Sequence, residues 1–300
     1  MNDFHEQPPR VHPVRIGPAG WSYKDWEGVV YPPSPGKRFD PLAWLAHFFD
    51  TIEVNSSFYR IPPPTHAASW TRRTAGHPDF RFTAKLYRGF THEKETAPGD
   101  AAAFRRFLDP LAEAGRLGAL LVQFPWSFRN DAENRDRIAR ILEEFADYPK
   151  AVEVRHASFD DPEFFAMLDE RATAFVNLDQ PLFSDSIAPA AVGTGALAYV
   201  RFHGRNYQKW FSHSESWERY DYLYSKQELA PWIGRIRSLA REREVYVVTN
   251  NHFRGQAIVN AVELKQALGQ PAEIPEPLAQ AYPERFGEAG NLLDREEGRT

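Results

Sequence analysis

Short apolar runs of the kind that form β-strands recur along the chain, with longer amphipathic stretches between them. The runs occupy residues 14–19, 51–55, 80–86, 118–124, 150–155, 173–179, 197–203 and 244–250. The intervening stretches show helical spacing, with apolar residues at i, i+3, i+4 and i+7 in 104–111 and again in 138–145. Eight strands that alternate with helices predict a parallel sheet, and the count of eight predicts a single closed (β/α)8 TIM barrel.

Local signals mark where several of these helices begin. The pairs Asp40-Pro41 and Asp161-Pro162 each place an N-cap residue before a proline in the first turn. Ser225 and Glu228 have the spacing of a capping box. The connection 180–196, rich in Pro, Ala and Gly, is the weakest predicted helix. A doubly wound open sheet is the alternative fold, but no Gly-rich phosphate fingerprint follows the first strand.

The predicted barrel spans 14–268, a length close to the about 250 residues that this fold usually takes. A flexible arm, 1–13, precedes it. A Pro- and Glu-rich tail, 269–300, follows and either packs on the barrel or trails from it. The first residues lack the apolar core of a signal peptide, and no apolar run approaches the about 20 residues of a membrane span. We therefore expect a cytoplasmic protein without membrane contact.

Polar residues share one face of most of the predicted strands. Side chains alternate between the two faces of a strand, so an apolar set that contacts the outer helices leaves the polar set facing the barrel axis. Barrel interiors are usually apolar, and a charge buried there costs several kcal/mol unless it is paired. We predict that one pocket at the C-terminal barrel face is lined by Glu53, Asn55, Lys85, Gln123, Glu153, Arg155, Asp179, Arg201, His203 and Asn250. The alternative is an ion network that only fills the lumen.

Composition narrows the chemistry of such a pocket. The net charge of −5 and the lack of a clustered basic run argue against duplex nucleic acid as the main partner. The chain contains no cysteine, which excludes disulfides, zinc–thiolate sites and cysteine nucleophiles.

Several blocks of the sequence resemble the YecE-like family, catalogued as DUF72. These blocks are GPAGWSYKDWEGVVYP, EVNSSFYRIP, FRFTAKLYRGFTH, GALLVQFPWSF, AVEVRHASF, YVRFHGR, ERYDYLYS and YVVTNNHFRGQAIVNA. The resemblance runs from about residue 14 to about residue 268 and implies a TIM barrel of no settled activity. One structural analogy that it brings is to endonuclease IV-like barrels, which cleave phosphodiesters with metal clusters. The first block departs slightly, reading Gly-Pro-Ala-Gly-Trp where the family more often has a Thr or Cys and a Ser beside the glycines.

A metal site and an anion site compete for the same strand ends. Oxygen and nitrogen ligands for a metal are available at Glu53, Glu153, Asp179 and His203. Lys85, Arg155 and Arg201 project into the same space and nearly neutralise it, so we predict no bound metal and no cofactor. The anion site would use Lys85, Arg155, Arg201 and Arg205. It would also use the loops after the last two strands, where Gly204, Gly255 and the helix start near Arg254 favour phosphate.

The predicted roles follow from this choice. Glu53, Glu153 and Asp179, each among cations, are the expected bases, and His203 is the expected acid or else a structural histidine. The expected substrate-binding set is Tyr23, Asn55, Lys85, Gln123, Arg155, Arg201, Arg205, Asn250 and Asn251. The aromatic loop 207–224 is either a lid over the ligand or packing at the top of the barrel.

Three functions remain open at this point. The first is a metal-independent enzyme acting on a small phosphate- or carboxylate-bearing substrate. The second, which the resemblance suggests, is an endonuclease IV-like metal-dependent phosphodiesterase on nucleic acid. The third is a non-catalytic module that binds nucleic acid or a metabolite in the same pocket.

Overall fold

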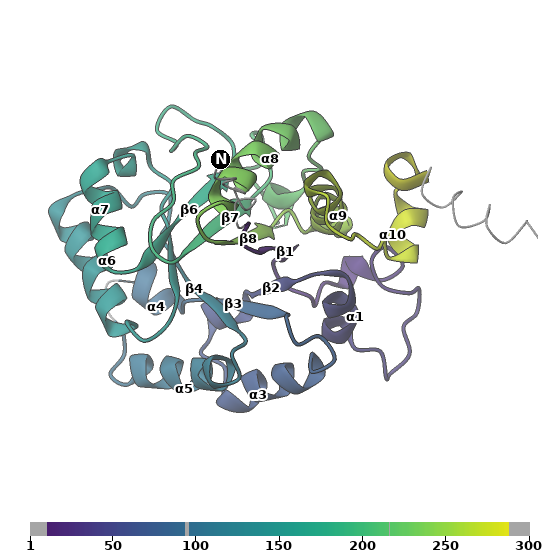
Figure 1. Ribbon diagram of the computed structural model, residues 1–300, viewed down its shortest axis with the longest axis horizontal. Coiled ribbons are helices and arrows are strands. Elements are labelled where there is room, and N and C mark those ends of the chain that lie inside the picture. The colour runs from purple at the N-terminus through teal and green to yellow at the C-terminus, as the bar shows by residue number, and fades with distance from the viewer. Residues whose placement is uncertain (1–10, 94–95, 216, 288–300) are drawn as a thin grey trace, which may run out of the picture.

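The computed structural model describes residues 11–93, 96–215 and 217–287, and within them eight parallel strands surround one lumen (Figure 1). Their order around the sheet is β1-β8-β7-β6-β5-β4-β3-β2. This arrangement confirms the predicted TIM barrel. The strands are β1 (Val14–Pro18), β2 (Thr51–Val54), β3 (Arg81–Lys85), β4 (Leu117–Gln123), β5 (Lys150–Glu153), β6 (Thr173–Asp179), β7 (Leu197–Phe202) and β8 (Glu244–Thr249).

Helices cover the outside of the strands (Figure 1). The longer ones are α1 (Pro41–Phe48), α3 (Pro64–Arg73), α5 (Asp100–Glu113), α6 (Ala132–Glu144), α7 (Pro162–Glu170), α8 (Lys226–Ala240) and α9 (Gln256–Leu268). Short helical turns lie in the connections: η1 (Lys24–Trp26), α2 (Ser56–Tyr59), α4 (Arg88–Thr91), η2 (Ala157–Phe159), η3 (Glu218–Tyr220), η4 (Phe253–Gly255) and α10 (Glu276–Ala281). No helix in the described ranges is long and apolar enough to cross a membrane.

The helix-start signals act as the sequence predicts. Asp40 and Asp161 accept hydrogen bonds from first-turn amides of α1 and α7. Ser225 and Glu228 form a complete capping box, so α8 begins at Lys226 although Pro231 lies inside it. The connection 180–196 contains no helix, contrary to the weak helix predicted there. Its prolines lack an amide donor and its glycines lose more backbone entropy in a helix than other residues do, which is why the segment stays irregular.

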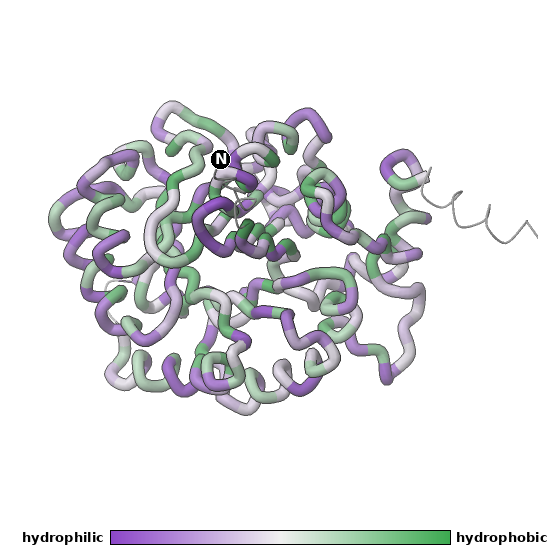
Figure 2. Tube along the Cα trace, viewed as in Figure 1, coloured by the Kyte–Doolittle hydropathy of each residue, from purple (hydrophilic) through white to green (hydrophobic). Residues whose placement is uncertain are grey.

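Two separate apolar layers reflect the alternation along the strands. The outer layer joins one face of the strands to the helices and includes Ile52, Phe82, Val152 and Val200. The inner layer fills the lumen with Ala19, Ala119, Leu121, Ala151, Ala174, Val176, Leu197, Tyr199, Tyr246 and Val248. Along the outer helices hydrophobic and hydrophilic positions alternate, as expected for one buried and one exposed face (Figure 2).

The end of the described chain packs back on the barrel. Leu278 of α10 is buried, and the Tyr282 hydroxyl donates a hydrogen bond to the Arg254 carbonyl. Arg285 is paired with Glu263 of α9. Most of the arm predicted at 1–13 and the end of the tail predicted at 269–300 lie outside the described residues.

The barrel closes between β1 and β2 without a continuous ladder. Asp50 donates its amide to the Ile16 carbonyl at 3.1 Å, and Gly20 donates to the Glu53 carbonyl at 2.8 Å. Gly17 lies at the closest point of this seam, where a Cβ atom would overlap the Thr51 carbonyl oxygen. The missing side chain at residue 17 therefore lets the two strands approach each other.

Replacing Gly17 by Ala should force the seam apart and lower the free energy of unfolding by about 1–3 kcal/mol or more. The control is Gly234→Ala in α8, at an exposed position where a Cβ meets nothing within 4 Å. That change should raise stability by up to about 1 kcal/mol because alanine favours helix. Urea denaturation of both variants measures the difference, and equal stability of Gly17→Ala and wild type would contradict the seam argument.

Candidate functional site

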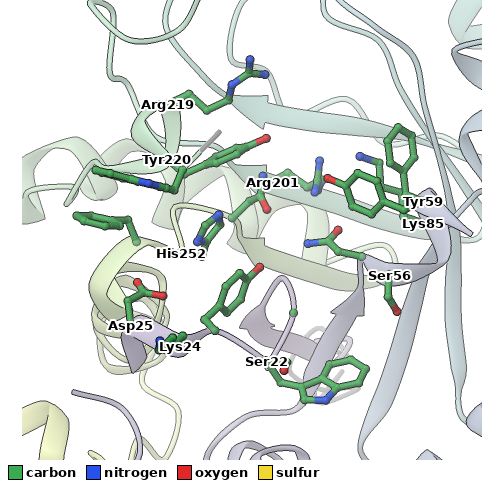
Figure 3. Close-up of a pocket in the computed structure, with 18 of the residues that line it drawn as sticks. Ser22, Lys24, Asp25, Ser56, Tyr59, Lys85, Arg201, Arg219, Tyr220 and His252 are labelled. Atoms are coloured by element: carbon green, nitrogen blue, oxygen red, sulfur yellow. The ribbon is translucent and has the colours of Figure 1, made fainter. Parts of the chain in front are cut away.

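A cavity of about 1140 Å³ opens at the C-terminal ends of the strands. Its walls come from the segments that follow β1, β2, β7 and β8, and its floor from residues that point up from the lumen (Figure 3). The lining residues are Gly20, Trp21, Ser22, Tyr23, Lys24, Asp25, Asn55, Ser56, Phe58, Tyr59, Lys85, Gln123, Arg201, Trp217, Arg219, Tyr220, Asn250, His252 and Phe253.

Beneath the cavity, Arg201 joins two buried carboxylates across the lumen. Its Nη2 donates to Glu53 Oε1 at 2.5 Å and its Nη1 donates to Glu153 Oε2 at 2.5 Å. Arg155 donates to the other oxygen of Glu153 from Nε at 3.0 Å and from Nη2 at 2.8 Å. The Tyr199 hydroxyl donates to the free oxygen of Glu53 at 2.9 Å. Each carboxylate oxygen thus has a donor, as a buried charge requires.

These pairings set the protonation states of the floor. Burial alone would raise the pKa of Glu153, but the Arg201 and Arg155 guanidiniums outweigh it and hold that pKa well below its usual range. Burial lowers the pKa of His203 to about 3, aided by the two arginines and opposed by Glu153. Glu153 is therefore ionised and His203 neutral at pH 7.

His203 is fully buried below the cavity rather than in its wall. Its Nε2 lies 3.1 Å from Glu153 Oε1, and its Nδ1 lies 3.1 Å from Asn250 Nδ2. A neutral ring with both nitrogens engaged is a poor proton donor to a ligand. This placement does not fit the acid role expected for His203 and favours the structural alternative.

Three of the expected site residues, Asp179, Arg205 and Asn251, point away from the cavity. Asp179 accepts hydrogen bonds from Arg205 at 2.6 and 2.7 Å and from Trp232 of α8 at 2.7 Å. Asn251 donates to Asn260 of α9 at 2.8 Å. Asp179 and its partner Arg205 therefore tie β6 to the outer layer, and Asn251 does the same for β8.

Asp179 points outward because of the sizes of the other side chains on β6. Ala174 and Val176 occupy the lumen, whose remaining space is taken by two tyrosine rings of other strands. The large ring of Phe175 packs outward against Phe165, and the alternation then sends Asp179 outward too. At β8, Asn250 points inward, so its neighbour Asn251 points outward.

The residues weighed as metal ligands do not converge on one point. Asp179 lies outside the lumen, and the Arg201 guanidinium stands between Glu53 and Glu153. Within the described ranges no group of three or more His, Asp or Glu side chains is arranged to hold a metal ion. An endonuclease IV-like metal cluster does not fit these residues.

The anion site expected around Arg201, Arg205 and the α9 start is also occupied by protein groups. Both terminal nitrogens of Arg201 form ion pairs with carboxylates, and Arg205 is paired with Asp179. The Arg254 amide, near the start of α9, donates to Asp25 Oδ2 at 2.6 Å. Anion binding at these three points would first require breaking protein contacts.

Lys85 is the exception among the cations predicted from the strands. Its Nζ lies 3.9 Å from the centre of the Phe58 ring, and no hydrogen bond or ion pair joins it to any described residue. Burial is the main cause that lowers the pKa of Lys85 to about 7; repulsion from Arg201 and Arg155 adds to it, and attraction to Glu153 and Glu53 opposes it. A large fraction of Lys85 is therefore the neutral amine at pH 7.

Aromatic rings form much of the cavity wall. The Tyr23 ring stacks on His252 at 4.3 Å, and Trp217 stacks on Phe253 at 4.2 Å. The loop 207–224 divides between the two roles weighed for it. Trp217 and Tyr220 border the cavity, whereas Trp210 and Tyr224 are buried as packing.

Sequence reasoning missed two kinds of residue. The first kind is Tyr199, which lies on the same strand face as Arg201 and His203. The alternation of side chains could therefore have predicted its inward position. Loop residues of the rim have no strand alternation to reveal them, namely Ser22, Lys24, Asp25, Ser56, Arg219 and His252.

Replacing Arg201 by Met should lower the free energy of unfolding by about 3–5 kcal/mol, because buried Glu53 loses its cationic partner and Glu153 keeps just Arg155. The matched variant is Lys85→Met, which removes an ammonium that has no partner to lose. It should leave stability at pH 6 unchanged or raised. Denaturation curves of the two variants measure this difference. A small loss of stability in Arg201→Met would mean that the carboxylates find other partners.

The lowered pKa of Lys85 also predicts a dependence of stability on pH. The unfolded state keeps the proton of this lysine up to about pH 10.4, while the folded state releases it near pH 7. The unfolded state thus binds more protons between these values, so wild-type stability rises with pH there. Relative to Lys85→Met, we expect a gain of up to about 1.4 kcal/mol per pH unit. Parallel denaturation curves from pH 6 to 10 measure it, and a constant difference would contradict the lowered pKa.

Known proteins similar to this chain also carry no assigned activity in their names. UPF0759 protein YunF of Bacillus subtilis is 29% identical over 277 residues, which cover 85% of this chain and 94% of that protein. UPF0759 protein YecE of Escherichia coli K12 is 26% identical over 170 residues, or 56% of each.

Solved structures agree with the fold and the family. A DUF72 family protein of Thermotoga maritima superposes with a TM-score of 0.76 at 35% identity, covering 86% of this chain and all of that one. A second DUF72 family protein, from Enterococcus faecalis, gives 0.74 at 27% identity over 88% and 98%. The model of the family described as "Protein of unknown function DUF72" matches residues 15–284. The chain therefore belongs to the DUF72 family.

Proposed function

We propose that this protein is a metal-independent enzyme that acts on a small anionic substrate bound in the cavity above Arg201. The observation that carries the proposal is Lys85, an unpaired lysine at the cavity floor whose pKa is lowered to about 7. A base works best when its pKa lies near the working pH, because it is then both available and strong enough to take a proton. Strongly shifted groups in clefts are typical of active sites.

Charge around the cavity favours an anion. Five cationic side chains belong to its wall and floor, against three carboxylates: Lys24, Lys85, Arg155, Arg201 and Arg219 against Asp25, Glu53 and Glu153. The floor pairs cancel one another and Asp25 offsets one cation of the rim, so the excess is one rim cation plus the fraction of Lys85 that is protonated. A cleft with such an excess concentrates anions even though the whole chain carries −5.

The roles in this proposal differ from those expected from the sequence. Lys85 takes a proton from the substrate, in place of the buried carboxylates Glu53 and Glu153. These two, with Arg201, form the ion pairs of the floor, while burial and repulsion from the Arg201 guanidinium lower the pKa of the Lys85 amine. The amide groups of Asn55, Gln123 and Asn250 border the cavity and supply hydrogen bonds that orient the substrate. Asp179 has no part in catalysis.

The test uses wild-type protein treated with EDTA. It is incubated with a panel of phosphorylated and carboxylated metabolites, and their consumption is followed by NMR. At least one compound should raise the melting temperature and be consumed without added metal, at a rate that rises through about pH 7. Lys85→Met should abolish consumption while the melting temperature of the free protein is kept. Turnover that requires added Mn²⁺ or Zn²⁺, or that survives in Lys85→Met, would refute the proposal.

A further inference from the structure

We propose that Lys85 reacts as a nucleophile, forming an imine with a substrate that carries an aldehyde or ketone and a phosphate or carboxylate group. This inference rests on the proposed function and narrows its substrate class. It starts from the placement of the amine at the end of β3, between the Phe58 ring and the open cavity.

The surroundings of Lys85 suit a nucleophile better than a binding cation. A lysine that only binds an anion gains from being charged, yet burial and the charge of Arg201 both oppose its protonation. The Phe58 ring covers one side of the amine; this contact favours the ammonium form, but the ring donates no hydrogen bond to nitrogen, so the lone pair of the neutral amine stays available. Desolvation beside another cation is a known way to activate lysine for attack on carbonyl groups.

The reaction balances with groups that the cavity already holds. The lone pair of Lys85 Nζ attacks the carbonyl carbon, and the C=O π electrons move to oxygen, which takes up a proton to give a carbinolamine. The carbinolamine then loses its hydroxyl as water and its N–H proton, leaving a C=N bond. The net change is amine plus carbonyl to imine plus water, with no oxidant or reductant.

Tyr59 is placed to assist the loss of water. Its ring packs edge to face on Phe58, with 5.2 Å between the ring centres, and Phe58 is the ring that contacts Lys85; both Tyr59 and Lys85 line the cavity (Figure 3). Burial and the nearby Tyr220 raise the pKa of Tyr59, so the phenol keeps its proton at neutral pH. A protonated hydroxyl in this position can donate to the departing oxygen.

The anionic part of the substrate is matched by the rim. Lys24 and Arg219 both border the cavity, and no carboxylate of the described residues forms an ion pair with either; the neutral partner of Arg219 is His213, whose Nε2 lies 2.8 Å from its Nη2. The arginines of the floor, in contrast, are already bound to carboxylates. A phosphate or carboxylate therefore gains most by facing the rim while the carbonyl group points down to Lys85.

Reductive trapping tests the imine directly. EDTA-treated protein is mixed at pH 7 with pyridoxal 5′-phosphate or with pyridoxal, reduced with borohydride, and examined by intact mass and peptide mapping. The chain has eight lysines, and we expect one adduct, on Lys85, that forms more readily with the phosphorylated probe. Arg219→Met should remove this preference for phosphate. Lys85→Arg keeps the charge and should give no adduct at residue 85.

The rate of adduct formation tests whether Tyr59 acts as the acid in imine formation. Tyr59→Phe should slow adduct formation by at least about tenfold while phosphate still raises the melting temperature as in wild type. Adducts spread evenly over the lysines, or none on Lys85, would overturn the imine. If turnover of an anionic compound still depends on Lys85 in that case, the lysine is a base and only the present inference fails. If no anion is bound or consumed at all, the proposed function fails as well.

Discussion

The bridge that Arg201 makes between Glu53 and Glu153 is the interaction on which the site depends. It joins β2, β5 and β7 across the lumen, where the side chains of all three partners are buried. An ion pair buried this deeply adds little to stability compared with an apolar core, but removing one member is expensive. The floor of the cavity is therefore held in one arrangement, and the groups above it have a fixed base.

The same bridge decides which cations face a ligand. Arg155 and Arg201 are consumed by the carboxylates, and Arg205 is consumed by Asp179 outside the lumen. Lys85 stands close enough to feel their charge and too far to share their partners. The lowered pKa of Lys85 thus arises first from burial, and the Arg201 guanidinium, fixed by its own carboxylate partners, lowers it further. An isolated lysine on an apolar surface would be desolvated but would lack this fixed repulsion.

Alternation of polar and apolar residues predicts the barrel and about half of the site. It places Glu53, Lys85 and Arg201 correctly, because β2, β3 and β7 each have one apolar and one polar face. It fails on β6, where apolar residues occupy both faces and the size of Phe175 decides the orientation. Alternation also cannot predict which residues form ion pairs, because partners such as Glu53 and Arg201 are 148 positions apart in the sequence. Residues at the rim of the cavity, such as Arg219, lie on loops, where side chains do not alternate regularly between two faces.

The seam between β1 and β2 has a dynamic consequence. Elsewhere around the barrel adjacent strands share regular ladders, but here isolated hydrogen bonds and the Gly17 contact hold the edges together. Local opening begins where backbone bonds are fewest, so amide exchange should be fastest along this line. The segments that leave these two strands carry Tyr23 on one side and Tyr59 on the other. Any local opening of the seam would therefore move these two tyrosines apart and change the width of the cavity mouth.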